Sequence, residues 1–376
     1  MIVHSYYDED PRVRREAETL ARAGDEVDVI ALRRPVDADA ATVDGVRVQR
    51  LGVQRHQGAG IATYLREYVS FLVRSGWALA RAHRHRRYDL VQVHSLPDFL
   101  VFAALPLRVL GVPVVLDLHE AMPEFFRSRF PRARGRVVHG VVRWQERLSI
   151  AFANRVITVN DALRDRLLEI GVPPGKVEVV ANAPDLTRFD PAAHPARPFA
   201  EDGIVRLIYA GALTPIYELD VVLDAIAELR GADPARAIEL EVYGRGDAEP
   251  GLAERARTLG IDGAVRFHGR IPIESVPAAI AAADIGVAPT RRDEFTDASL
   301  STKIFEYAAM GKPVVASALP LVDRTFPAGT VATYEPGDPH DLARAIGTVI
   351  EDAGGRARAV DATRRVVAER SWAAEA

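Results

Sequence analysis

Residues 301–316 of the chain read STKIFEYAAMGKPVVA. Ser301 or Thr302 is a suitable N-cap, Gly311 is typical of the residue that ends a helix, and Pro313 prevents the helix from continuing. A run of β-branched residues follows at once. The stretch therefore predicts a helix, a tight turn and a buried strand, which together form one unit of a parallel α/β fold.

The same alternation of short apolar runs and longer periodic segments extends on both sides of this stretch, and it restarts after a proline-rich passage at 184–198. We expect two doubly wound α/β halves joined near 184–200, with ligands bound outside the carboxyl ends of the strands and in a cleft between the halves. Strands are expected at 2–4, 27–31, 46–50, 90–93, 112–118, 155–159, 204–209, 238–243, 265–268, 285–288 and 314–316. Helices are expected at about 11–23, 61–86, 218–230, 250–259, 273–282, 302–310, 338–351 and 356–375.

The composition excludes several classes of protein. The chain has 376 residues, of which 48% are apolar and 27% charged, close to the average for a globular protein. It lacks cysteine, which excludes disulfides and thiolate metal sites and fits a reducing compartment. Neither a secretory signal nor an apolar run of about 18 residues is visible.

The two halves of the chain differ in charge. Residues 1–195 carry 28 Lys and Arg against 24 Asp and Glu, whereas residues 196–376 carry 20 against 28. Halves of opposite sign suggest two domains with different partners. The bias is too weak and too diffuse for nucleic-acid binding, which needs a concentrated basic stripe.

The helix expected at 302–310 has the features of an anion site. The loop that precedes it directs backbone N–H groups toward the helix start, and Lys303 lies in the first turn, where a cation is favourable only if an anion joins it. A diphosphate fits such a site. Lys303 and Glu306 are also spaced to form a surface ion pair, and this alternative stays open.

Histidines follow two strands of the first half. His119 and Glu120 come directly after the strand that ends at Leu118, and His94 ends the neighbouring strand. An imidazole at a strand end can bind a phosphate or a sugar hydroxyl, or transfer a proton. A histidine bonded to a core carbonyl is the alternative, although two histidines at adjacent strand ends are harder to dismiss than one.

Three other motifs give weaker evidence of function. Residues 244–247, Gly-Arg-Gly-Asp, lack the third glycine of the dinucleotide fingerprint, so no cofactor is expected. The acidic run at 8–10 precedes a helix, where Asp10 serves as a cap, so no metal site is expected. No serine has the sequence context of a hydrolase nucleophile.

The segment Arg127–Arg147 contains seven arginines, a single acid and interleaved apolar residues. A basic amphipathic helix of this kind can lie on an anionic membrane. It can also be a solvated helix whose apolar face packs into the core. Peripheral membrane contact through Arg127–Arg147 is therefore one of two interpretations of this segment that stay open.

With these residues in view, the chain resembles a family 4 glycosyltransferase of the GT-B fold over nearly its whole length. The order and spacing of the motifs are specific. They are Asp10–Ala17, Leu116–Glu124, Val156–Asn160, Gly175–Asp185, Tyr209–Thr214, Val242–Gly246, Phe267–Arg270, Ala283–Pro289 and Lys303–Ala316.

The resemblance implies a cytoplasmic, retaining and metal-independent hexosyltransferase of bacterial polysaccharide or glycoconjugate biosynthesis. It would move a sugar from a UDP- or GDP-sugar to an unidentified acceptor. The resemblance also implies residues 1–188 as the acceptor-binding domain, 189–352 as the nucleotide-sugar domain, and 353–376 as a helix that crosses toward the first domain. Peripheral association with the inner face of the membrane would fit such an enzyme.

The resemblance assigns roles to individual residues. In the first domain His119 would face the donor sugar and phosphate. The candidate catalytic residues are His119 and Glu120, together with Lys303 of the second domain, and His94 is a candidate for binding substrate. In the second domain, Lys303 and the loop amides of Ser299, Leu300, Ser301 and Thr302 would hold the diphosphate. Gly211 would let the backbone approach the diphosphate, Glu306 would bind the ribose, and residues near Arg270 would border the base.

The chain departs from the family at several positions. Ala298 stands where most members carry an acid, and Ala212 and Tyr217 stand where many carry Arg and Lys. Arg291 or Arg292 is a candidate for the missing positive charge. These departures leave two other functions open, a non-catalytic nucleotide-sugar-binding protein and a GT-B sugar-nucleotide epimerase.

Overall fold

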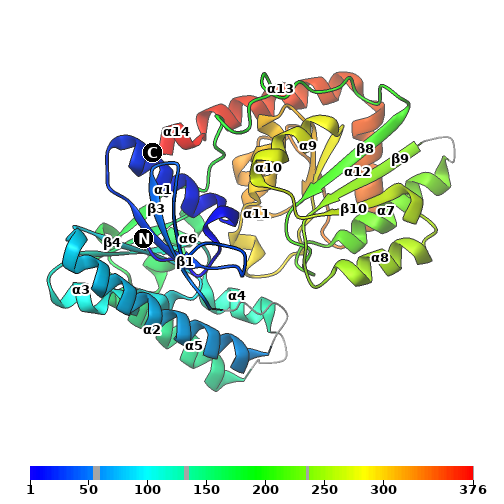
Figure 1. Ribbon diagram of the computed structural model, residues 1–376. Helices are drawn as coiled ribbons and strands as arrows, with labels where there is room; N and C mark the ends of the chain where they lie inside the picture. Colours follow the sequence, from blue (N-terminus) through cyan, green and yellow to red (C-terminus); the bar gives the residue numbers. More distant parts are fainter. Residues whose placement is uncertain (54–59, 131–134, 234–236, 376) are drawn as a thin grey trace. The chain divides into compact units, whose positions relative to one another are not determined.

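The computed structural model describes residues 1–53, 60–130, 135–233 and 237–375. The chain divides into two compact units, Met1–Asn182 and Ala183–Glu375, and each is built on its own sheet (Figure 1). The sheet of the second unit is parallel, and that of the first is parallel except for the antiparallel pair β2 and β3. The domain limits and domain roles expected from the sequence stay predictions. No helix among the described residues is long and apolar enough to cross a bilayer.

The first unit contains seven strands in two groups, ordered β1-β3-β2 and β4-β5-β6-β7. The segment at the start of the chain runs between β1 and β4, where Ile2 bridges both Ile30 and Val93. It replaces the separate strand expected at 2–4 and joins the groups into one sheet. The strands are β1 (Asp28–Leu32), β2 (Ala40–Val43), β3 (Val46–Leu51), β4 (Val91–His94), β5 (Val114–Leu118), β6 (Arg155–Thr158) and β7 (Val177–Val179).

Helices cover both faces of this sheet. Helix α1 packs with Val29 and Val48 on one face, whereas α2 and α5 contribute Phe71 and Ile150 to the core on the other. The helices are α1 (Pro11–Ala23), α2 (Ile61–Arg86), α3 (Leu105–Val109), α4 (Met122–Arg129), α5 (Arg136–Phe152) and α6 (Asp161–Glu169), with the 3₁₀ helices η1 (Tyr7–Glu9), η2 (Asp98–Ala104) and η3 (Pro174–Lys176).

Local signals set several of these boundaries. Asp10 caps α1 by accepting from the Val13 N–H, and Gly24 ends the helix in a left-handed conformation. Other boundaries differ from the sequence expectation. The basic segment Arg127–Arg147 is not one helix, because α4 ends at Arg129 and α5 begins at Arg136.

The second unit has a six-stranded parallel sheet in the order β10-β9-β8-β11-β12-β13. This is the doubly wound Rossmann-like order, whose direction of winding reverses between β8 and β11, and ligands of such folds bind where it reverses. The strands are β8 (Ile204–Ala210), β9 (Ala237–Tyr243), β10 (Val265–Gly269), β11 (Ile285–Ala288), β12 (Val314–Ser317) and β13 (Ala332–Tyr334).

The segments that connect these strands are mostly helical. The helices are α7 (Leu219–Ala232), α8 (Glu249–Thr258), α9 (Val276–Ala282), α10 (Thr302–Ala309), α11 (Pro320–Thr325), α12 (Pro339–Glu351), α13 (Ala353–Glu369) and α14 (Trp372–Glu375), with the 3₁₀ helices η4 (Asp262–Ala264), η5 (Ile273–Ser275) and η6 (Thr296–Ala298). The stretch quoted first forms α10, a turn at Gly311 and β12, as predicted.

Candidate functional site

Lys303 in the first turn of α10 is a buried cation. Its side chain folds back over Tyr217, with Nζ 4.0 Å from the ring centroid, and the residue is only 8% exposed. Lys303 does not form the ion pair with Glu306 that its spacing allowed, and among the described residues its ammonium meets no carboxylate. A buried charge without a counter-charge is costly, so this site favours an anionic ligand.

Backbone donors surround the same point. Within the described residues, the N–H groups of residues 300–303 donate to no protein acceptor. Ser301 holds the N-cap position, but its side chain makes no capping bond. The amide of Ser299 is not available, because it donates to the Thr296 carbonyl at 3.0 Å. The free donors are therefore those of Leu300, Ser301, Thr302 and Lys303, one residue later than the group expected from the sequence.

Gly211, directly after β8, makes room for Lys303. A Cβ at Gly211 would lie 2.3 Å from the Lys303 Cε, far inside any tolerable contact. The hydroxyl of Tyr209 donates to the Ala212 carbonyl at 2.7 Å and fixes the turn after the strand. Since β8 and β11 flank the reversal of the sheet, Gly211 and α10 meet where this fold binds its ligands.

Two further glycines hold the neighbouring loop against Gly211. The Gly211 N–H donates to the Tyr243 carbonyl at 2.8 Å, and the Leu213 N–H to the Arg245 carbonyl at 3.1 Å. A Cβ at Gly244 would lie 1.8 Å from the Gly211 oxygen, and one at Gly246 would lie 2.0 Å from that of Leu213. Gly244 and Gly246 therefore allow the two loops to pack backbone against backbone. Arg270 is exposed just after β10.

Tyr307 locks α10 to the sheet. Its hydroxyl accepts the Ala210 N–H at 3.0 Å, at the end of β8. Its ring lies against β11, where a Cβ at Gly286 would come within 2.3 Å of it. The helix that carries Lys303 and Glu306 therefore has a fixed position relative to the two strands that flank the site.

The residues that depart from the family find other partners. Tyr217 provides the aromatic face for Lys303. Arg291 pairs with Asp293 at 3.1 Å and Arg292 with Asp297 at 3.3 Å, so both candidate replacement cations already have local counter-charges.

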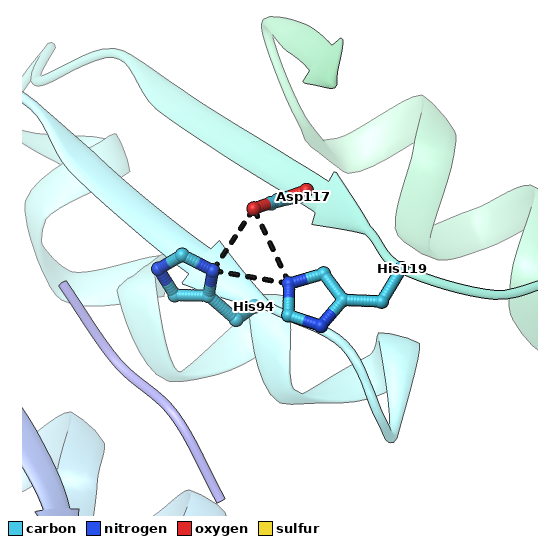
Figure 2. Close-up of side chains that lie close together, drawn as sticks. All are labelled: His94, Asp117 and His119. Carbon is cyan, nitrogen blue, oxygen red and sulfur yellow. Dashed lines mark hydrogen bonds and ion pairs between the residues drawn. The ribbon is translucent and has the colours of Figure 1, made fainter. Parts of the chain in front are cut away.

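In the first unit, Asp117 gathers both candidate histidines (Figure 2). Its Oδ2 lies 3.0 Å from Nδ1 of His94 and 3.3 Å from Nε2 of His119, and these two nitrogens are 3.3 Å apart. Register explains the meeting, because β4 and β5 pair with His94 opposite Asp117. The structure thus brings His94 and His119, which end or follow adjacent strands, into contact with one carboxylate.

Side chains that surround this cluster keep the Asp117 carboxylate in its charged form. Arg12 of α1 contacts Asp117 at 2.8 Å and Glu16 at 3.1 Å, and Gln92 donates to Glu16 at 2.8 Å. Burial alone would raise the pKa of Asp117, but Arg12 and then His119 outweigh it and hold that pKa well below its usual range. Burial and the neighbouring Asp117 raise the pKa of Glu16.

The arrangement leaves one imidazole nitrogen for a ligand. His94 is fully buried, whereas the side chain of His119 is 20% exposed. Nδ1 of His119 points away from Asp117 (Figure 2). With Nε2 held by the carboxylate, Nδ1 can accept from a hydroxyl, or donate to a phosphate when the ring is protonated.

The same three side chains are the one group among the described residues whose donor atoms lie close enough to hold a metal ion. Their separations of 3.0 to 3.3 Å are also those of hydrogen bonds. Asp117 already has a cationic partner in Arg12. The set therefore fits a hydrogen-bonded cluster with its charge balanced by arginine.

Glu120 lies in different surroundings. It lines a small cavity with Leu118, Thr158 and Arg166, and burial raises its pKa to about 7. Glu146, which also lines the cavity, pairs with Arg166 at 2.8 Å. Glu120 is thus placed among carboxyl groups and Arg166, and its catalytic role stays a prediction.

Sequence reasoning missed the residues that hold the histidines. Asp117 was visible as a charged residue in an otherwise apolar strand, which signals a buried and therefore paired carboxylate. Its partner Arg12 lies 105 positions earlier on an arginine-rich helix. Nothing local distinguishes Arg12 from its neighbours Arg14 and Arg15.

Comparisons with known proteins match both halves of the chain to glycosyltransferase families. Residues 10–183 match the family model of the glycosyl transferase 4-like domain, and residues 205–352 match that of glycosyl transferases group 1. The D-inositol 3-phosphate glycosyltransferase of Kineococcus radiotolerans is 29% identical over 321 residues, covering 81% of this chain and 71% of that protein. The chain belongs to the family 4 glycosyltransferases of the GT-B type, and it is a glycosyltransferase.

Solved structures agree on the fold. Sucrose-phosphate synthase from Thermosynechococcus elongatus matches with a TM-score of 0.75 at 20% identity, covering 97% of this chain and 90% of that one. HepE from Anabaena, in complex with UDP-glucose, matches with a TM-score of 0.71 at 16% identity, covering 100% and 96%. The predicted pair of Rossmann-like domains of the GT-B fold is confirmed.

The Arg12–Asp117 contact can be tested through its pH dependence. In Arg12→Gln, burial would raise the pKa of Asp117, so at about pH 7 an uncompensated buried charge should lower the free energy of unfolding by about 3–5 kcal/mol. The loss should shrink toward about pH 5, because a carboxyl with a raised pKa takes up a proton as the pH falls. In the unchanged protein the depressed pKa has the opposite effect: the stability it contributes is present above about pH 4 and is lost only below it.

Urea unfolding at both pH values measures the effect. Arg257→Gln is the matched control, because Arg257 and its partner Glu254 are both more than 60% exposed and should contribute less than about 0.5 kcal/mol. Equal losses for Arg12→Gln at both pH values would show that Arg12 does not govern the charge of Asp117.

Proposed function

We propose that this glycosyltransferase moves a hexosyl group from a nucleotide-sugar donor, a UDP- or GDP-sugar, to an acceptor that is still unidentified. The transfer would retain the anomeric configuration and need no metal ion. The observation that carries the proposal is the buried Lys303, without a carboxylate partner, beside four free N–H groups where the second sheet reverses.

The site suits a nucleoside diphosphate as leaving group. Negative charge grows on the diphosphate as the bond to the anomeric carbon breaks, and donors placed in advance contribute most where charge develops. Lys303, the amides of residues 300–303 and the dipole of α10 are such donors. The HepE structure contains UDP-glucose, which supports a nucleotide sugar as the donor here.

Other predicted residues take complementary roles in this proposal. Glu306, one turn after Lys303 on α10, would bind the ribose hydroxyls, and Arg270 would border the base. His119, oriented through Nε2 by Asp117, would present Nδ1 to the donor sugar or phosphate. The charge that divalent metals supply in other transferases would come from Lys303 and the helix N-terminus, and membership of the family supports retention.

The reaction itself is tested by NMR on the purified chain with UDP-glucose and GDP-mannose in excess EDTA. Release of UDP or GDP together with a hexose or glycoside that first forms as the donor's own anomer would support the proposal. An inverted first product would contradict retention, and loss of release that magnesium restores would contradict metal independence. Conversion of one nucleotide sugar into another without release would identify an epimerase instead.

Lys303→Met should separate diphosphate binding from stability. Methionine keeps most of the packing against Tyr217 but removes the charge, so stability should hold or rise. Affinity for UDP or GDP should fall about tenfold or more, because a charged hydrogen bond contributes roughly 1.5–3 kcal/mol. The bare nucleosides should bind as before.

Calorimetry with each nucleotide and its nucleoside measures this difference. Lys176→Met is the control, since Lys176 lies in the first unit, where its ammonium donates to the Ala151 carbonyl at 3.4 Å. Equal losses for nucleotide and nucleoside would remove Lys303 from the phosphate site.

His119→Ala should lower kcat by about 10²–10⁴-fold with a smaller effect on donor affinity, because its bond is proposed to form mainly in the reacting complex. His119→Gln should recover part of the activity if hydrogen bonding is its role. A structural histidine would behave differently, with a lower melting temperature and near-normal turnover per folded molecule. The exposed His340→Ala provides the control for histidine removal.

A further inference from the structure

Large apolar side chains are unusually exposed on three helices of the first unit. Among the described residues, fifteen such side chains are exposed, and twelve of them lie on α2, on α3 with the residue after it, and on α5. We name these twelve the α2–α5 surface. They are Leu65, Val69, Val73, Trp77, Leu105, Val109, Leu110, Val137, Val138, Val141, Trp144 and Leu148.

The exposed residues form stripes with helical spacing. On α2 they recur at every fourth position, from Leu65 to Trp77. On α5 they begin with the adjacent pair Val137 and Val138 and continue at intervals of three or four to Leu148. Such spacing places them along one face of each helix. The opposite faces contribute Phe71 and Ile150 to the same core, so both helices cover one side of the sheet with η2 packed against each (Figure 1).

The charges around these stripes have a single sign. Helices α2 and α5 carry one acid each, Glu67 and Glu146, and both are buried, at 4% and 3% exposure. Glu67 lies 3.1 Å from His4 and Glu146 lies 2.8 Å from Arg166. Every exposed charged side chain of the two helices is an arginine, namely Arg66, Arg74, Arg81, Arg84, Arg86, Arg136, Arg143 and Arg147.

We propose that the α2–α5 surface docks on an anionic lipid bilayer. Its tryptophans, valines and leucines would enter the boundary between headgroups and acyl chains, and its arginines would bind the lipid phosphates. The composition argues against a second copy of the chain as the occupant. A symmetric dimer would bring the same arginines of two copies together without an exposed carboxylate on either helix to pair them.

This surface is wider than the segment Arg127–Arg147 that the sequence singled out. It includes α2 and α3, and the apolar stripe of α5 faces solvent rather than the core, with Val137 79% and Trp144 63% exposed. The proposal is independent of the donor chemistry, because Lys303 and Gly211 belong to the second unit.

Tryptophan fluorescence of the full-length chain tests docking directly. The chain contains three tryptophans, of which Trp77 and Trp144 are 66% and 63% exposed on this surface and Trp372 is 7% exposed in α14. Vesicles of phosphatidylcholine with phosphatidylglycerol should shift the emission to the blue and carry the protein with them when they float. Pure phosphatidylcholine vesicles should bind far more weakly, and added salt should weaken the binding to anionic vesicles.

Matched variants assign the binding to the surface. Val73→Glu and Val141→Glu should each weaken binding to anionic vesicles about tenfold, while Val36→Glu, at a valine that is 90% exposed elsewhere, should leave it unchanged. Arg74→Glu and Arg143→Glu should weaken it about fivefold or more each, against Arg365→Glu on α13 as control. Melting temperatures confirm that these exposed substitutions leave the fold intact.

Three results would overturn the proposal. The first is no flotation with anionic vesicles. The second is equal binding by Val73→Glu, Val141→Glu and Val36→Glu. The third is a lipid-free dimer in sedimentation that Val73→Glu dissociates, which would assign the surface to a second copy of the chain.

Discussion

A charge removed from water needs a partner, and the two halves of this protein meet that requirement in different ways. Asp117 is completely buried and receives Arg12, His94 and His119, so the first unit balances its central carboxylate internally. In the second unit Lys303 is almost as deeply buried, yet within the described part of the chain its ammonium contacts the faces of Tyr209 and Tyr217 and meets no carboxylate. The first unit therefore contains a polar cluster whose charges balance one another. The second unit contains a buried cation that an anionic ligand would neutralise.

Topology determines where these charges appear. In the second sheet the order reverses between β8 and β11, and the loops that leave these strands carry Gly211 and α10. Without side chains at Gly211, Gly244 and Gly246, the backbones approach one another closely and the ammonium of Lys303 fits among them. In the first sheet the pairing of β4 with β5 aligns His94 with Asp117. Both sites thus arise from strand order and register, with the chemistry supplied by a few residues at the strand ends.

The sequence was most informative where structure depends on neighbours along the chain. Capping residues located α1, the length of α2 was predicted to the residue, and the unit from α10 to β12 followed from its glycine and proline. Short strands without a strong apolar run, such as β2, β7 and β13, were missed because sheet pairing rather than composition stabilises them. The Arg12–Asp117 contact was also missed, since it joins residues 105 positions apart and only tertiary structure selects that arginine. Exposure of the α5 stripe could not be read from its periodicity, which is the same for a helix face turned toward the core or toward solvent.

The hydrogen bond between the Ala210 amide and the Tyr307 hydroxyl has a consequence for how such an enzyme can diversify. It fastens α10 to the end of β8, and Gly286 lets the Tyr307 ring rest directly on β11, so helix and strands behave as one solid block. A mutation that tilts α10 would therefore break the bond between Ala210 and Tyr307 as well as change the position of Lys303. The loop at 289–299 contacts the segment after β8 instead, through the Arg291 N–H and the Ile216 carbonyl at 2.8 Å, and its arginines pair with acids a few residues away. Under the proposed function, that loop can therefore change in sequence while the block that carries Lys303 keeps its position.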